Sequence, residues 1–233
     1  MATQRTRAVP AEMSRRAEAR WPAFASLIVM LLLYALAPAE FVPRLVLIGI
    51  AVLMFIPLLV LNPHRLSRET SWSRWLSISF ALVLVAGNLV DMGSLIFDLV
   101  NGSTLGYRIL LTALQVWAAS IVAYAIVYWE LDRGGPVSRG TQPRDKLGRP
   151  DFKFVQDDNT DSVTEVRNQS SELADWRPGF IDYLYLSLTN MIAFSPTDTM
   201  PLSPRAKILM GLQSVCGFIL LALVIARSVN ILA

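Results

Sequence analysis

Two long apolar stretches, WLSISFALVLVAGNLVDMGSLIFDLV (75–100) and LGYRILLTALQVWAASIVAYAIVYW (105–129), follow one another with only a short turn between them. Each contains about 25 residues, and a helix that rises 1.5 Å per residue needs about 20 apolar residues to cross a bilayer. The turn VNGST (100–104) contains the glycine and small polar residues that interrupt helices. This part of the sequence therefore predicts two consecutive transmembrane helices.

Three further apolar runs lie outward from this pair, at residues 22–37, 45–61 and 208–232. The first two have roughly 17 residues, which is short for a span but within the usual range. The composition agrees, because 54% of the residues are apolar and only 17% are charged, whereas soluble proteins contain about 25% charged residues. The mean hydropathy is +0.46. The predicted fold class is an all-α polytopic membrane protein with five or six transmembrane helices.

The arginine distribution predicts the orientation of these helices, because short cytoplasmic loops carry an excess of Lys and Arg. Five arginines precede the first apolar run and three lie within 62–74, whereas the 38–44 loop has one and the 101–104 turn has none. We therefore expect a cytoplasmic N-terminus. Four tryptophans fall at this same boundary, as in an interfacial aromatic belt: Trp21, Trp72, Trp75 and Trp129.

The pattern divides the chain into an Arg-rich arm (1–20), a four-helix transmembrane region (21–129), a polar loop (130–178) and a C-terminal region (179–233). Residues 131–178 carry nine acidic and eight basic side chains, which predicts a solvated, partly disordered segment on the cytoplasmic side. In the last region, FIDYLYLSLTNMIAF (180–194) is short for a span and predicts a re-entrant half-helix before the last helix. A sixth, short span is the alternative.

The composition excludes several chemistries. One histidine, His64, and one cysteine, Cys216, cannot assemble a Cys/His zinc site or an intrachain disulfide. The phosphate-binding motifs GxGxxG and GxxxxGK[ST] do not occur, and no basic stripe with interleaved aromatic residues indicates nucleic-acid binding. We therefore predict no enzymatic activity, no metal, no cofactor and no nucleic-acid partner.

The stretch SLTNMIAFSPTDTMPLSPRAK (187–207) contains the candidate site. Its three prolines interrupt a helix, and irregular backbone at membrane depth occurs only inside protein or beside a water-filled cavity. Ion filters use such backbone, with carbonyl and side-chain oxygens replacing the hydration shell of the ion. The candidate ion-pathway residues are Thr189, Asn190, Ser195, Thr197, Asp198 and Thr199. The alternative is an ordinary interfacial loop in which Asp198 caps a turn.

Two charges inside apolar runs form a second candidate feature. Asp91 lies in the 75–100 run, and Arg227 lies near the end of the 208–232 run. Charged side chains at membrane depth are costly and usually pair or face water. We therefore predict an intramembrane charge pair between Asp91 and Arg227. Snorkelling of Arg227 to the nearby interface is the alternative.

The segment LTNMIAFSPTDTMPLSPRAKILMGLQSVCGF (188–218) resembles the pore module of two-span potassium channels, with a pore helix, an acidic residue, a proline and an inner helix. The corresponding positions are Thr189 and Asn190 at the end of the pore helix, Asp198 and Pro201 after the filter, and Gly211 or Gly217 at the inner-helix hinge. The TVGYG filter motif does not occur. The resemblance therefore implies a pore-like architecture without the potassium filter.

A second resemblance covers more of the chain. The segments YWELDRGGP (128–136), DYLYLSLTN (182–190), AFSPTDTMPL (193–202) and VNIL (229–232) are similar to a family of uncharacterised bacterial integral membrane proteins, a domain of unknown function. This resemblance implies a multi-pass protein of the bacterial inner membrane. The function predicted from the sequence is an ion-channel-like pore for a small monovalent cation in the lipid bilayer, assembled as a homo-oligomer. The alternative is a non-conducting scaffold that binds a partner through its polar loop.

Overall fold

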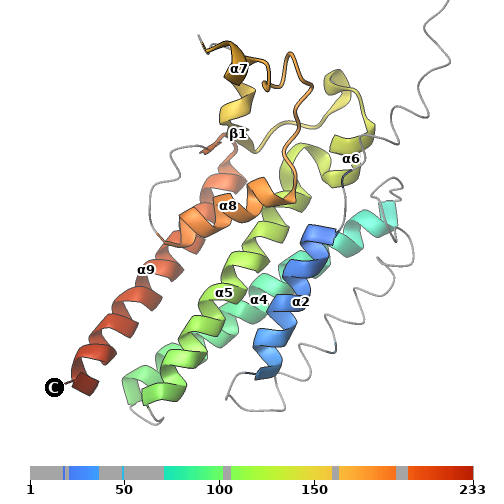
Figure 1. Ribbon diagram of the computed structural model, residues 1–233. Helices are drawn as coiled ribbons and strands as arrows, with labels where there is room; N and C mark the ends of the chain where they lie inside the picture. Colours follow the sequence, from blue (N-terminus) through green and yellow to red (C-terminus); the bar gives the residue numbers. More distant parts are fainter. Residues whose placement is uncertain are drawn as a thin grey trace, which may run out of the picture.

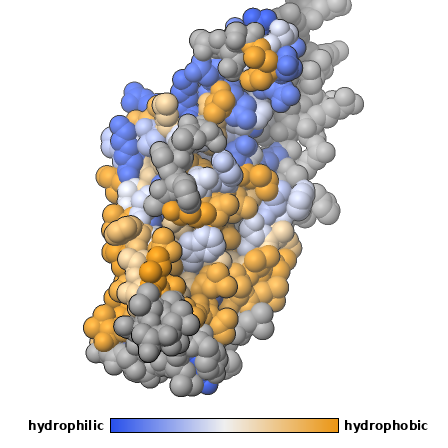
Figure 2. Space-filling view, turned by 60° about the vertical axis from the view of Figure 1, so that its left-hand side comes forward, coloured by the Kyte–Doolittle hydropathy of each residue, from blue (hydrophilic) through white to orange (hydrophobic). Residues whose placement is uncertain are grey.

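The computed structural model describes residues 18, 21–36, 49, 71–101, 106–158, 163–192 and 199–232. Within this part of the chain, three helices are long and apolar enough to cross a membrane: α4 (Ser71–Asn101), α5 (Gly106–Leu131) and α9 (Pro204–Leu232). Helix α5 packs against both α4 and α9 (Figure 1). On the face shown in Figure 2, apolar side chains predominate over the helices, and hydrophilic residues gather at one end of the molecule. The prediction of a helical membrane protein is therefore supported.

The N-terminal helix α2 (Trp21–Leu36) is apolar but shorter than these three, and it packs on α5. It coincides with the first predicted run. The second predicted run, at residues 45–61, lies outside the described residues except for position 49. The number of spans, five or six, therefore stays a prediction.

Helix α5 ends at a turn of three residues with positive φ: Arg133 (50°), Gly134 (85°) and Gly135 (92°). Glycine is required at position 135, because a φ of 92° with a ψ of 172° is a backbone conformation that residues with a side chain rarely adopt. Pro136 then begins the short helix α6 (Pro136–Thr141), where its missing N–H leaves no helical hydrogen bond unmade. The chain thereby reverses direction and folds back over the helix ends.

The hydrophilic end of the molecule is a folded unit, which we call the cap and define as residues 132–158 and 163–179. Besides α6, the cap contains η1 (Asp132–Gly134), η2 (Arg144–Lys146), β1 (Phe152–Phe154), η3 (Val155–Asp157) and α7 (Thr164–Arg167). Composition predicts a solvated loop here. In the described residues, however, Phe152 and Phe154 are buried, and both rings pack against the ring of Tyr183 at centroid distances of 6.3 and 5.4 Å. These two aromatic side chains provide the apolar core that the overall composition conceals.

Helix α8 (Phe180–Met191) begins at the cap, where the ring of Phe180 lies 5.6 Å from that of Trp129. It packs against α5 and α9 (Figure 1). Strand β2 (Thr199–Pro201) pairs antiparallel with β1, and α9 follows directly. The start of α8, strand β2 and the start of α9 therefore all lie at the cap.

Three of the four tryptophans expected at the membrane boundary face outward at this end of the helices. Trp21 is 70% exposed at the start of α2, and Trp72 and Trp75 are 61% and 70% exposed in the first turns of α4. Trp129 differs, since it is only 5% exposed and its indole N–H donates to a carboxylate. The outward-facing tryptophans are typical of an interfacial belt, whereas Trp129 belongs to the protein interior.

Candidate functional site

Helix α8 is about 18 Å long at 1.5 Å per residue, which is shorter than a bilayer core. Its last residue, Met191, lies against Gly217 of α9, where an added Cβ would collide with the carbonyl oxygen of Met191. At the same rise, Gly217 lies about 20 Å from the start of α9, close to the middle of that helix. The C-terminal end of α8 is therefore placed halfway along α9 by a close backbone contact that only glycine permits.

A cluster of neutral polar side chains holds α8 between α5 and α9. We call it the Gln213 cluster, and its members are Tyr128, Ser187, Asn190, Gln213 and Ser214. The side-chain oxygen of Gln213 accepts hydrogen bonds from the Tyr128 hydroxyl (2.7 Å) and from Nδ2 of Asn190 (2.9 Å). Its Nε2 donates to the backbone oxygen (3.1 Å) and to the hydroxyl oxygen (2.7 Å) of Ser187. Gln213 thereby connects all three helices while being fully buried.

The other members of the cluster extend it to the backbone. The Ser187 hydroxyl donates to the carbonyl oxygen of Ile121 in α5 (2.7 Å), and Nδ2 of Asn190 also donates to that of Met210 in α9 (2.9 Å). The Ser214 hydroxyl donates to Oδ1 of Asn190 (2.9 Å). Buried polar groups must be hydrogen-bonded to avoid a desolvation cost, and these groups are. The cluster therefore fixes the position of α8.

The six candidate ion-pathway residues do not form one described site. Thr189 and Asn190 lie in the last turns of α8, where the Thr189 hydroxyl donates to the carbonyl oxygens of Tyr185 and Leu186 within the helix. Thr199 is buried in strand β2 at the cap, opposite Phe154. The remaining three, Ser195, Thr197 and Asp198, lie outside the described residues.

The predicted charge pair is described only in part. Asp91 lies on α4 and Arg227 on α9, but the side chain of Arg227 is outside the described part of the structure. Both helices run away from the cap. At 1.5 Å per residue, Asp91 lies about 30 Å from the start of α4 and Arg227 about 35 Å from the start of α9. The two positions thus have similar depth, and the pair itself stays a prediction.

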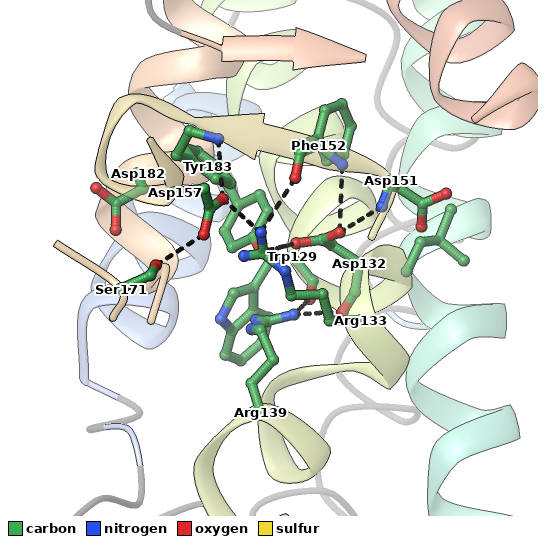
Figure 3. A network of polar contacts seen from close by, with 12 residues as sticks. Trp129, Asp132, Arg133, Arg139, Asp151, Phe152, Asp157, Ser171, Asp182 and Tyr183 are labelled. Atoms are coloured by element: carbon green, nitrogen blue, oxygen red, sulfur yellow. Dashed lines mark hydrogen bonds and ion pairs between the residues drawn. The ribbon is translucent and has the colours of Figure 1, made fainter. Parts of the chain in front are cut away.

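A second, charged cluster occupies the cap (Figure 3). Its centre is the carboxylate of Asp132, which is fully buried. Oδ1 accepts the backbone N–H groups of Asp151 (2.7 Å) and Phe152 (3.3 Å), and Oδ2 accepts the Tyr183 hydroxyl (2.5 Å) and lies 3.7 Å from Nη1 of Arg133. We call these residues the Asp132 cluster. They connect the end of α5 to β1 and to α8.

Asp151 connects the cap to the start of α9. Its Oδ1 accepts the hydroxyl of Ser203 (2.5 Å) and Nε of Arg205 (2.7 Å), and its Oδ2 accepts Nη2 of Arg205 (2.5 Å). The two bonds from Arg205 form a bidentate pair, which is strong and has a defined geometry. The carbonyl oxygen of Asp151 also accepts the N–H of Leu202 (2.7 Å). The start of α9 is therefore held firmly to the cap.

Glu18, three residues before α2, brings a further carboxylate to the cap. It accepts hydrogen bonds from Nε1 of Trp129 (2.9 Å) and from the backbone N–H of Phe180 (2.5 Å), and it lies 3.9 Å from Nη2 of Arg139. Burial raises the pKa of Glu18 above its ordinary value of 4.5, although Arg139 and the two hydrogen bonds act in the opposite direction. The negative charge of Asp182 nearby also raises this pKa.

Sequence reasoning missed the residues at the centre of both clusters. Gln213 carries a signal that could have identified it, because it is an isolated amide in an apolar run. Asp132 carries none, since it is one among many charges of the polar loop and only the fold brings its partners together. The same holds for Arg139 beside Glu18. Among the described residues, no group of three or more His, Cys, Asp or Glu side chains could hold a metal ion.

Comparisons with family models, with curated proteins and with solved structures found no match to this chain. The two resemblances drawn from its sequence therefore stay predictions.

Proposed function

We propose that the protein is an integral membrane protein that binds or conducts a small monovalent cation, with residues 180–203 forming a re-entrant half-helix and its return. The course of α8 carries the proposal: it starts at the cap, ends beside Gly217 about halfway along α9, and is followed by Thr199 at the cap again. A helix that stops within the depth of its neighbours is the arrangement that transporters use to reach ions at the membrane midplane.

The C-terminal end of such a half-helix attracts cations. The last four carbonyl groups of a helix have no partner within it, and the macrodipole gives this end a partial negative charge. In broken transmembrane helices, such carbonyl ends help to coordinate Na⁺ or H⁺. Thr189 and Asn190 lie in the last turns of α8, and Asp198 follows in the sequence. We place the cation at this end of α8.

The segment that connects α8 to β2 is firmly held at both of its ends, which supports its role as an ion path. On one side, the Gln213 cluster and the Met191–Gly217 contact hold the end of α8. On the other, β2 pairs with β1, and Asp151 binds Arg205 at the start of α9. The segment between these anchors contains Ser195, Thr197 and Asp198. Selective ion binding requires oxygen ligands with restricted freedom, and firm anchors at both ends of the segment provide this restriction.

We further propose that the cap faces the bacterial cytoplasm, that the C-terminus lies outside, and that the chain forms a homo-oligomer. The arginine counts support the first point. The C-terminus follows because α9 starts at the cap and runs away from it. The third point is supported by α9, which exposes a row of large apolar side chains, including Leu212, Val215 and Phe218, on which another subunit could pack.

Reconstitution in liposomes tests the proposal. Purified protein should dissipate a K⁺ or Na⁺ gradient, and Asp198→Asn should reduce the flux at least ten-fold, because it removes the charge next to the proposed path. Asp145→Asn, which neutralises an exposed aspartate of the cap, is the matched control and should conduct like the wild type. Equal flux through wild type and D198N, or no flux through either, would contradict conduction along this path.

One observation favours the alternative, a non-conducting scaffold that binds a partner through the cap. A pocket of about 180 Å³ lies between η3 and α7, and two exposed apolar side chains are among its mostly polar lining residues. Val155 and Val166 line the pocket and are 48% and 46% exposed, although they lie outside the membrane region. A partner bound here should be lost from Val166→Lys and kept by Glu172→Lys on the same cap. Liposomes containing the wild type would then show no cation flux.

A further inference from the structure

The carboxylate of Glu18 lies in a set of donors contributed by three separate parts of the fold. The donors are the indole N–H of Trp129 at the end of α5, the backbone N–H of Phe180 at the start of α8, and the guanidinium of Arg139 in α6. Two neutral donors and one positive charge therefore converge on one anionic group. This combination is typical of sites that bind carboxylate or phosphate.

Arg139 shows that the site needs an anion. Its side chain is only 2% exposed, and Nη1 donates to the carbonyl oxygens of Trp129 (2.8 Å) and Asp132 (2.7 Å). Nε and Nη2 are buried and make no hydrogen bond within the described part of the chain. The guanidinium also lies 4.9 Å from the ring centre of Tyr183. A buried positive charge with unused donors favours an anion beside it, and Glu18 faces Nη2 at 3.9 Å.

The start of α8 is shaped to admit that anion. An added Cβ at Gly179 would lie only 3.3 Å from Oε1 of Glu18, so the absence of a side chain lets the carboxylate approach the backbone closely. The N-terminal end of a twelve-residue helix contributes free N–H groups and a partial positive charge. Asp182 acts in the opposite direction electrostatically, but its Oδ2 accepts the N–H of Gly179 (2.8 Å) and leaves that of Phe180 to Glu18.

We propose that Trp129, Arg139 and the first turn of α8 form an anion-binding site that Glu18 occupies as an internal ligand, and that binds a phosphate group when Glu18 leaves. Glu18 competes with external anions because it belongs to the same chain and is always present at high effective concentration. Trp21, three residues further on, is exposed at the membrane boundary. The site therefore lies close to the level of lipid headgroups, so the phosphate could come from a lipid or from solution.

Calorimetric titration of the full-length protein in detergent with inorganic phosphate tests the site. Glu18→Ala should bind phosphate at least ten-fold more tightly than the wild type, because it removes the internal competitor. Adding Trp129→Phe to this variant should weaken binding roughly ten-fold, since it removes one donor to a charged group while keeping an aromatic ring. Glu172→Ala removes an exposed acid of the cap and should bind like the wild type.

Circular dichroism and gel filtration check that each variant is folded, and Glu18→Gln takes the place of E18A if the latter is not. Nanodiscs of phosphatidylcholine with or without phosphatidic acid then distinguish the two sources of phosphate. If the ligand is a lipid headgroup, phosphatidic acid should abolish phosphate binding by E18A; if it is free phosphate, binding should be unchanged. The proposal is overturned if E18A binds phosphate no more tightly than wild type, or if W129F leaves its affinity unaltered.

Discussion

Asp132 in the cap and Gln213 in α9 are both fully buried, yet their surroundings differ in kind. Asp132 is ionisable and lies beside the charged side chain of Arg133, with two backbone N–H groups and a hydroxyl completing its hydrogen bonds. Gln213 is neutral, and its four hydrogen bonds join hydroxyl, amide and carbonyl groups. Each cluster connects three elements that are distant in the sequence.

The difference reflects the surroundings of the two clusters, which are water at the cap and lipid at membrane depth. The cap can bury ions because their charges are balanced at close range, and its edges remain in water. At membrane depth, an unbalanced charge is far more costly, whereas amides and hydroxyls can bond across helices at a modest energy for each bond. The same task, fixing α8 to its neighbours, is therefore carried out with charged groups at one end and neutral groups at the other.

The largest loss of stability is expected from breaking the Asp132 cluster. Asp132→Asn should lower the free energy of unfolding by about 3–5 kcal/mol, because the new amide N–H₂ faces buried groups that donate. Arg133 keeps its ion pair with Asp157 but loses the negative charge beside its Nη1. Denaturant titration in detergent, followed by circular dichroism, measures this loss. Asp145→Asn, on the exposed surface of the cap, should change stability by less than about 0.5 kcal/mol. A D132N protein as stable as D145N would show that the cap does not depend on this carboxylate.

The membrane region should be sensitive to close packing as well. Gly217→Ala should destabilise the protein by about 1–3 kcal/mol, since the added methyl group collides with backbone at the end of α8. Gly211→Ala, on the same helix, is the matched control because an added Cβ there meets nothing within 4 Å. G211A should be neutral or slightly stabilising, as alanine favours helix more than glycine. Equal stability of the two variants would mean that α8 does not end against Gly217.

A smaller loss of stability is expected from breaking the Gln213 cluster. Gln213→Leu should cost about 1–2 kcal/mol, given the modest strength of hydrogen bonds between transmembrane helices. A double-mutant cycle with Tyr128→Phe isolates the bond between the two side chains, and its coupling energy should fall between about 0.6 and 1.7 kcal/mol. Zero coupling would exclude this bond. If Q213L proved as damaging as D132N, the contrast between the two clusters would be wrong.

The smallest effect concerns pH and the Glu18 carboxylate at the edge of the cap. Because burial raises its pKa above 4.5 in the folded protein, the folded state binds the proton more tightly than the unfolded state. This contribution to stability is complete at pH values below the pKa of Glu18 in the unfolded state. It is lost as the pH rises through the higher pKa of the folded state. Melting temperatures of Glu18→Gln should lack this decline between acidic and neutral pH, since the amide does not titrate. Identical pH profiles for wild type and E18Q would contradict this contribution of Glu18 to stability.

Much of the fold could be predicted because hydropathy is a local property of the sequence. The runs at 75–100 and 105–129 coincide with α4 and α5, and the short segment at 180–194 contains the twelve-residue α8. The candidate site was harder to predict. Asn190 was selected as an ion-pathway residue, and its amide is buried in hydrogen bonds to Gln213 and Met210. Its spacing in the sequence does not reveal which helix it faces.

The sequence by itself determined that the protein has helices long and apolar enough to cross a membrane and where these helices lie, because the length and hydropathy of each run are local properties. Only the tertiary structure decided which polar residues are buried. Glu18 approaches Arg139, and Asp151 binds Arg205, across large distances in the sequence, and only the fold makes these opposite charges neighbours. Composition counts such charges but not their partners, so a segment that resembles a solvated loop folds into a cap that holds the starts of α8 and α9.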